Sequence, residues 1–187
     1  MKIDKIINKI DELLLTKDNI IIGIDGPSGA GKSSLAHFLA THFQANIISI
    51  DYFFLQDNQR TKERLNKIGY FFDIERFIKE VVNNLIKHND FYYYIYNCHS
   101  KKLIKSDLVK INKLTIIEGV YAFNPKIINL YDLKIYVDVS KEEQLKRLKN
   151  RSIQLYDMFI NDWLIKENMY FEKYHVKDSS DIIVKND

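Results

Sequence analysis

Eight consecutive residues, Gly26-Pro27-Ser28-Gly29-Ala30-Gly31-Lys32-Ser33, have the types and the spacing needed to bind a polyphosphate. They fit the pattern G-x-x-x-x-G-K-[ST], in which glycines let successive backbone N–H groups surround an anion. The lysine of such a loop reaches the β- and γ-phosphates, and the hydroxyl of the last residue reaches Mg²⁺. The stretch therefore predicts a site for ATP or GTP with Mg²⁺. We expect contacts to the nucleotide from Gly26, Ser28, Gly29, Ala30, Gly31, Lys32, Ser33 and Ser34.

The residues on both sides of this loop have the patterns that such a site requires. Residues 19–25 form a short, apolar, β-branched run, which is typical of a buried strand. Apolar residues recur at helical spacing over residues 34–43. A loop that only turns the chain would need neither flanking element. A strand, a glycine loop and a helix in this order place an anion at the N-terminus of the helix, where the backbone dipoles favour negative charge.

Two acidic residues follow other apolar runs. Asp51 comes after residues 45–50, and Glu118 comes after residues 114–117. Ligands bind at the carboxyl edge of parallel sheets, so we expect both acids beside the loop. Two carboxylates facing a triphosphate require a cation between them, which again indicates Mg²⁺, bound by Ser33, Glu118 and Asp51. One acid would hold the hydration shell of the metal and the other would accept a proton from an attacking hydroxyl; the alternative is a solvated or capping acid at each strand end.

Periodicity predicts the other elements around this site. A strand, a crossover helix and a second strand within residues 19–50 predict a right-handed βαβ unit and hence a parallel sheet. We expect residues 52–72, with aromatic clusters at 52–54 and 70–72, to form a long loop. The remaining expected elements are an amphipathic helix at 3–15, a helix from 74, a hairpin at 91–107, strands at 133–137 and 181–184, a short helix after Ser140 and a longer one carrying apolar residues from 160 to 174.

Composition limits the classes of protein to which the chain can belong. Its 187 residues suit one domain, residues 1–187, and 46% hydrophobic with 28% charged residues is the balance of a globular protein. The net charge of +3 is spread along the chain, which argues against a nucleic-acid partner. No run of 18 apolar residues predicts a membrane span, and the first five residues lack an apolar core, so we expect a cytoplasmic protein. The sequence leaves a homo-oligomer open.

Several segments together resemble one known family, the uridine kinases. They occur here in the order seen in that family: residues 26–33, Asp51-Tyr52-Phe53-Phe54, Phe72-Asp73-Ile74-Glu75-Arg76-Phe77, Ile117-Glu118-Gly119 and Arg147-Leu148-Lys149-Asn150-Arg151. Short bacterial uridine-kinase-like proteins are the most similar, through Phe53-Phe54-Leu55 and Gln59-Arg60-Thr61. The resemblance covers nearly the whole chain after residue 18. It implies a P-loop kinase fold, with a five-stranded parallel sheet in the order 2-3-1-4-5, helices on both faces and a small β-hairpin insertion.

The resemblance also implies roles for individual residues. The reaction would be ATP-dependent phosphorylation of the 5′-hydroxyl of uridine or cytidine, with Asp51 taking the proton and Glu118 near Mg²⁺. The catalytic set is then Asp51, Lys32 and the two lid arginines, Arg147 and Arg151, within a lid at about residues 141–157. The acceptor-binding set is Asp73 for the ribose, Tyr96 and His99 for the base, and Arg60 of the Gln-Arg-Thr segment.

Other interpretations of the same residues stay open. Asp73 directly precedes a strongly periodic helix and is a favoured N-cap, a role that is compatible with binding ribose. His99 is also typical of a polar surface, and Arg147 with Arg151 of a solvated basic stripe. The same chemistry on pantothenate or a sugar, or a nucleotide-binding regulatory protein with little turnover, are the alternative functions.

Overall fold

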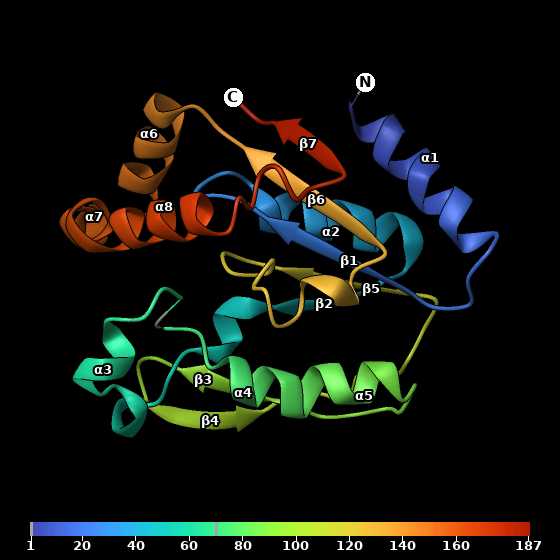
Figure 1. The fold of residues 1–187 in the computed structure, drawn as a ribbon, viewed down its shortest axis with the longest axis horizontal. Helices are drawn as coiled ribbons and strands as arrows, with labels where there is room; N and C mark the ends of the chain where they lie inside the picture. The colour runs from blue at the N-terminus through green and yellow to red at the C-terminus, as the bar shows by residue number, and fades with distance from the viewer. Residues whose placement is uncertain (1, 70) are drawn as a thin grey trace.

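The computed structural model describes residues 2–69 and 71–187, so Tyr70 of the predicted aromatic cluster lies outside the described residues. Its main sheet has five parallel strands in the order β2-β5-β1-β6-β7 (Figure 1). The strands are β1 (Ile20–Asp25), β2 (Asn46–Ser49), β5 (Leu114–Glu118), β6 (Leu133–Asp138) and β7 (Ile182–Lys185). Counted within this sheet alone, the order is 2-3-1-4-5, which confirms the predicted fold class.

Helices cover both faces of the sheet (Figure 1). On one face, α1 (Lys2–Leu14) and α2 (Lys32–Phe43) bury Ile6 and Leu39 against alternate residues of β1. On the other face, the helix from 74 and the helix that ends at 173 pack their aromatic and aliphatic side chains around Ile48 and Ile117. Because both faces are covered, the strands are continuously apolar, as the sequence predicts for parallel strands.

Two of these helices contain a π-helical turn. The first runs through α4 (Ile74–Phe77), a π segment at Ile78–Val82 and α5 (Asn83–Ile86). The second follows α6 (Lys141–Arg151) and runs through α7 (Ile153–Met158), a π segment at Phe159–Trp163 and α8 (Leu164–Lys173). π turns often lie at functional sites because the extra residue changes which side chains face one side of the helix.

A β-hairpin lies below the main sheet in Figure 1. Its strands are β3 (Tyr94–Asn97) and β4 (Lys102–Lys105), which pair in antiparallel register with Tyr96 opposite Leu103. A further antiparallel bridge joins Phe91 to Val109. The regular strands lie within residues 91–107, where the sequence predicts a hairpin.

The segment from 52 to 72 differs from the continuous loop that we predicted. It contains 3₁₀ turns at Ile50–Phe53 and Asp57–Gln59 and the one-turn helix α3 (Lys62–Leu65). Local side chains stabilise these turns, since the hydroxyl of Thr61 accepts a hydrogen bond from the Arg64 N–H at 3.2 Å. Such short turns leave no periodic apolar pattern, and this is why the sequence did not reveal them.

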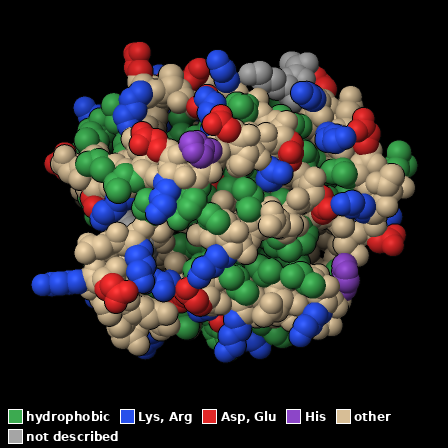
Figure 2. All heavy atoms as spheres, viewed as in Figure 1, with side chains coloured by type: hydrophobic (Ala, Val, Ile, Leu, Met, Phe, Trp, Pro, Cys, Tyr) green, Lys and Arg blue, Asp and Glu red, His purple; other side chains and the backbone are tan. Residues whose placement is uncertain are grey.

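The surface seen in Figure 2 carries basic and acidic side chains interspersed with apolar ones rather than one basic patch. Within residues 2–69 and 71–187, no helix is both long and apolar enough to cross a membrane.

Candidate active site

The loop between β1 and α2 has the close-packed backbone that its glycines predict. Gly26 has a φ of 143°, and a Cβ there would lie 2.1 Å from the carbonyl oxygen of Val137. Gly31, which directly precedes α2, has a φ of 95°. L-residues with a side chain rarely adopt either conformation, so both positions require glycine. The loop can therefore pass close to β6 before α2 begins.

Lys32 lies in the first turn of α2 and folds back over the loop. Its Nζ donates to the carbonyl oxygens of Gly26 at 2.8 Å and Pro27 at 3.0 Å, and the side chain is buried. The ammonium group is thus held in the concave side of the loop, where a phosphate would bind.

Asp25, the last residue of β1, holds the start of the loop in place through hydrogen bonds. Its carboxylate accepts hydrogen bonds from the Gly26 N–H at 2.6 Å, the Phe123 N–H at 2.9 Å and the Tyr170 hydroxyl at 2.8 Å. The side chain is fully buried, and this loss of hydration raises the pKa of Asp25 to about 6. Our sequence analysis missed this residue. Its signal was an acid at the end of a buried strand directly before the loop.

Ser33, Glu118 and Asp51 lie at the carboxyl edge of the sheet, as predicted. The hydroxyl of Ser33 donates to a carboxylate oxygen of Glu118 at 3.0 Å. Glu118 ends β5, and Asp51 follows β2 by two residues. All three line a cavity of about 520 Å³ together with the loop. This cavity is lined by Ser28, Gly29, Gly31, Lys32, Ser33, Ser34, Asp51, Glu118, Val120, Arg147, Arg151 and Asn186. We call it the phosphate cavity.

Although part of the Asp51 side chain is exposed, the protein packed around its carboxyl group removes hydration and so raises its pKa. The positive charge of Lys32 opposes this shift, and the negative charge of Glu118 adds to it. A carboxylate with a raised pKa is a stronger base than an ordinary aspartate, which suits proton abstraction.

A second cavity, of about 460 Å³, shares lining residues with the first, and its lining is mostly apolar with several aromatic rings. It is lined by Ser28, Ile50, Asp51, Phe54, Phe71, Phe72, Val120, Tyr121, Arg151, Ser152, Leu155, Phe159, Trp163 and Glu167. We call it the acceptor cavity. Asp51 lines both cavities, so a molecule in the second would meet this carboxylate beside the phosphates.

The rings of Phe54, Phe71 and Trp163 form one wall, with centroid distances of 6.0–6.5 Å. Sequence reasoning indicated Phe71 only as part of an aromatic cluster, and Phe54 as part of a cluster and of the family-like motifs, but neither as a cavity residue. It missed Trp163 and Glu167 as cavity residues because a helical apolar pattern does not show which side chains face a cavity.

Arg147 and Arg151 both line the phosphate cavity, and Arg151 also lines the acceptor cavity. They lie one turn apart on α6, where the predicted lid begins. Arg147 donates to Glu143 at 2.9 Å and to the carbonyl oxygen of Gly29 at 3.3 Å. The structure thus brings both arginines beside the loop.

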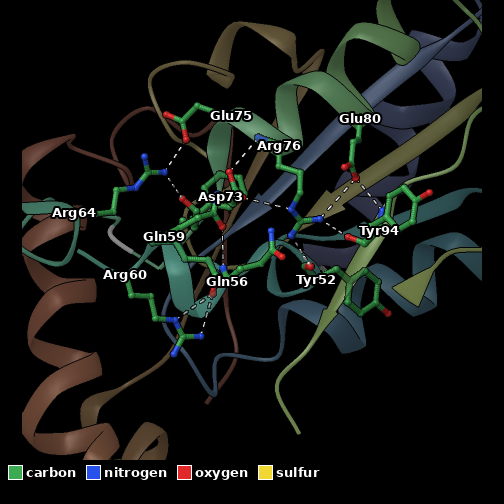
Figure 3. A network of polar contacts seen from close by, with 12 residues as sticks. Tyr52, Gln56, Gln59, Arg60, Arg64, Asp73, Glu75, Arg76, Glu80 and Tyr94 are labelled. Carbon is green, nitrogen blue, oxygen red and sulfur yellow. Dashed lines mark hydrogen bonds and ion pairs between the residues drawn. The ribbon is translucent and has the colours of Figure 1, made fainter. Parts of the chain in front are cut away.

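Asp73 is the buried centre of a network of polar contacts (Figure 3). One carboxylate oxygen caps α4 by accepting from the Arg76 N–H at 3.1 Å, and the other accepts from the Gln59 side chain at 2.9 Å. Only 2% of Asp73 is exposed, and it does not line the acceptor cavity. It is the helix cap that its sequence position suggested, and its binding of ribose stays a prediction.

The other predicted acceptor residues lie outside the lining of the acceptor cavity. The hydroxyl of Tyr96 donates to Asp57 at 3.0 Å, and the Arg60 guanidinium lies over the rings of Tyr96 and Phe71. His99 is exposed in the turn between β3 and β4. None of Tyr96, His99 and Arg60 lines the acceptor cavity, so their contacts to a base remain predictions.

One protein family and several known proteins are similar to this chain in sequence. The sequence profile of the phosphoribulokinase / uridine kinase family matches residues 21–155. A uridine kinase of Bacillus mycoides (strain KBAB4) is 26% identical over 188 residues, covering 90% of this chain and 86% of that protein. A uridine kinase of Schizosaccharomyces pombe is 29% identical over 143 residues, which cover 71% of this chain and 31% of that protein.

Solved structures share the fold at lower identity. A structure described as a possible uridine kinase from Bacillus stearothermophilus superposes with a TM-score of 0.74 at 19% identity, covering 98% of this chain and all of that one. The YFH7 protein of Saccharomyces cerevisiae gives a TM-score of 0.65 at 13% identity. At these identities the likeness shows the fold alone.

The burial of Asp25 generates a prediction about pH. Because its pKa rises from 3.8 in the unfolded chain to about 6 in the folded protein, the folded state binds more protons between these values. The contribution of Asp25 to the free energy of unfolding should therefore fall by about 2 kcal/mol as pH rises from 4 to 7. In Asp25→Asn this component disappears, while in the exposed control Asp178→Asn it remains. Urea unfolding at several pH values measures the difference, and parallel pH curves for Asp25→Asn and the parent would contradict the assignment.

Proposed function

Because this chain belongs to the phosphoribulokinase / uridine kinase family, we propose that it is an ATP-dependent kinase for the 5′-hydroxyl of a nucleoside, uridine or cytidine. One observation carries the proposal: Asp51 lines the phosphate cavity and the aromatic acceptor cavity at once. A hydroxyl in the second cavity would meet a proton acceptor beside the phosphoryl group in the first. Such positioning supplies a large part of the catalysis in phosphoryl transfer.

In this proposal, the loop and its cations hold the triphosphate. Backbone N–H groups from Gly29 to Ser33 would bind phosphate oxygens at the N-terminus of α2. Lys32 would exchange its two loop carbonyls for the β- and γ-phosphates, and Arg147 and Arg151 would neutralise charge that develops during transfer.

The oxygen donors present fit Mg²⁺. The described residues contain no group of three or more His, Cys, Asp or Glu side chains that could hold a metal by themselves. Mg²⁺ in kinases typically needs one or two protein oxygens, with waters and phosphates as its other ligands. The Ser33 hydroxyl and a carboxylate oxygen of Glu118, 3.0 Å apart, would supply those oxygens, and Asp51 lines the same cavity. When bound, the ion would neutralise charge on the phosphates.

The acceptor cavity supports a planar group on the acceptor. The rings of Phe54, Phe71 and Trp163 offer faces and edges against which a nucleobase can pack. Both carboxylate oxygens of Asp73 already accept hydrogen bonds within the protein, which leaves less capacity to bind ribose. This favours a second candidate, the same transfer to a non-ribose hydroxyl such as that of pantothenate or a sugar. We place the nucleoside first because the relatives named uridine kinase cover most of this chain.

Lys32→Ala should lower kcat/KM for ATP by about 10²–10³-fold, because it removes the main cation of the phosphate cavity. Lys5→Ala on α1, an exposed lysine outside both cavities, is the matched control. Steady-state ADP formation measures both variants. An unchanged kcat/KM for ATP in Lys32→Ala would remove the loop from the mechanism.

Asp51→Asn keeps the shape of the side chain but removes the base, so kcat should fall by about 10²–10⁴-fold while ATP still binds. In the parent, activity should decline as pH falls through the raised pKa of Asp51. The measurement is kcat against pH together with ATP affinity by calorimetry. Normal turnover in Asp51→Asn would leave this residue as a strand-end acid.

A panel of acceptors tests the substrate proposal. Uridine, cytidine, pantothenate, a hexose and a no-acceptor control are each incubated with ATP and Mg²⁺, and ADP is measured. We expect ADP with uridine or cytidine above the control. ADP with pantothenate or the hexose alone would overturn the nucleoside and retain the kinase, whereas no acceptor-dependent ADP would favour a nucleotide-binding regulatory protein.

A further inference from the structure

A buried carboxylate on the acceptor side is bonded directly to the phosphate loop. Glu167 of α8 accepts hydrogen bonds from both the backbone N–H of Ser28, at 3.0 Å, and the Ser28 hydroxyl. Glu167 is only 6% exposed, and what is exposed lines the acceptor cavity. A buried carboxylate is costly unless donors satisfy it, so this pair must be maintained in the folded protein.

Ser28 is the loop residue that the two cavities share. The carbonyl oxygen of Ser28 accepts a hydrogen bond from the Gln144 side chain of α6 at 2.9 Å. The residue is therefore clamped between α6, which lies within the lid region, and α8, which follows that region. No other residue lines both cavities and has its N–H, hydroxyl and carbonyl all held by these two helices among the described parts of the chain.

The helix that carries Glu167 also contributes Phe159 and Trp163 to the acceptor cavity. Phe159, Trp163 and Glu167 are spaced by four residues, and all three line the acceptor cavity. In a regular α-helix, with 3.6 residues per turn, residues spaced by four do not stay on one side of the axis. The π segment Phe159–Trp163 has more residues per turn, which keeps these three side chains on the same side. One rigid element thus joins the acceptor wall to the loop.

We propose that Glu167 is a positioning residue for phosphoryl transfer, which fixes Ser28 and hence the phosphate loop relative to the acceptor cavity. The proposal rests on the proposed kinase function but concerns a different contact. Glu167 acts through Ser28 and takes no proton from the acceptor. Burial raises the pKa of the Glu167 carboxyl group, and the hydrogen bonds from Ser28 oppose this shift. The charge of Lys32 also lowers that pKa and the charge of Asp51 raises it, so Glu167 lies within electrostatic reach of both groups.

A misplacement of about 1 Å in a reacting group can cost about 100-fold in rate, so loss of this clamp should be measurable. Glu167→Ala should lower kcat by about 100-fold, and Glu167→Gln, which keeps one oxygen acceptor, by less. Ser28→Ala should lower kcat by less than Glu167→Ala does, because the backbone N–H of residue 28 can still donate to Glu167.

The decisive test is a double-mutant cycle on ATP affinity and on kcat, with Glu172→Ala as the control on the exposed side of the same helix. Calorimetry with ATP and Mg²⁺ needs no acceptor, so it separates this inference from the proposed function. We expect Glu167→Ala with Ser28→Ala to be no worse than Glu167→Ala alone, in affinity and in rate.

If the fold-losses of kcat or ATP affinity in the two single variants multiply in the double variant, the proposal is overturned, because the two residues would then act independently. So would a Glu167→Gln variant with parental ATP affinity and kcat but a lowered melting temperature, since that pattern shows a role in stability alone. If the acceptor panel fails while the cycle shows coupling, the clamp stands and only the proposed acceptor chemistry falls.

Discussion

The buried carboxylate of Asp25 is the interaction on which the rest of the site depends. Three donors from three parts of the chain meet on it: the first residue of the phosphate loop, the segment after β5 and the helix α8. Burial of a carboxylate costs free energy, which is why its pKa lies near 6, and the three hydrogen bonds offset part of that cost. In return, the start of the loop is fixed relative to β5 and to the helix that forms the acceptor wall.

The loop is fixed a second time by the helices α6 and α8. Gln144 and Glu167 hold Ser28, and Arg147 reaches the carbonyl oxygen of Gly29. The loop therefore cannot shift without moving α6 and α8, whose side chains line both cavities. Between these attachments, parallel β2 and β5 bring Asp51 and Glu118 to the same sheet edge. Binding of phosphate and of acceptor would thus be linked through a small set of buried polar contacts.

The sequence predicted the parts of this structure that follow local rules. A G-x-x-x-x-G-K-S pattern between a strand and a helix predicted the loop, and acids after apolar runs predicted Asp51 and Glu118 at the sheet edge. Asp25, Trp163 and Glu167 escaped prediction because their roles come from contacts between residues more than 100 positions apart, or from the face that a π turn presents. For Asp73 the sequence predicted one contact and missed another. Its position predicted the cap on α4, but not the hydrogen bond from Gln59 to its second carboxylate oxygen.

The central claim is that the two cavities meeting at Asp51 pass a phosphoryl group from ATP to an acceptor hydroxyl. Single-turnover reaction of the parent protein with γ-labelled ATP, Mg²⁺ and uridine, followed by separation of the products, tests it most directly. The account predicts that the label appears in uridine 5′-monophosphate within one turnover. Label found only in inorganic phosphate, or remaining in ATP with uridine and with cytidine, would contradict it.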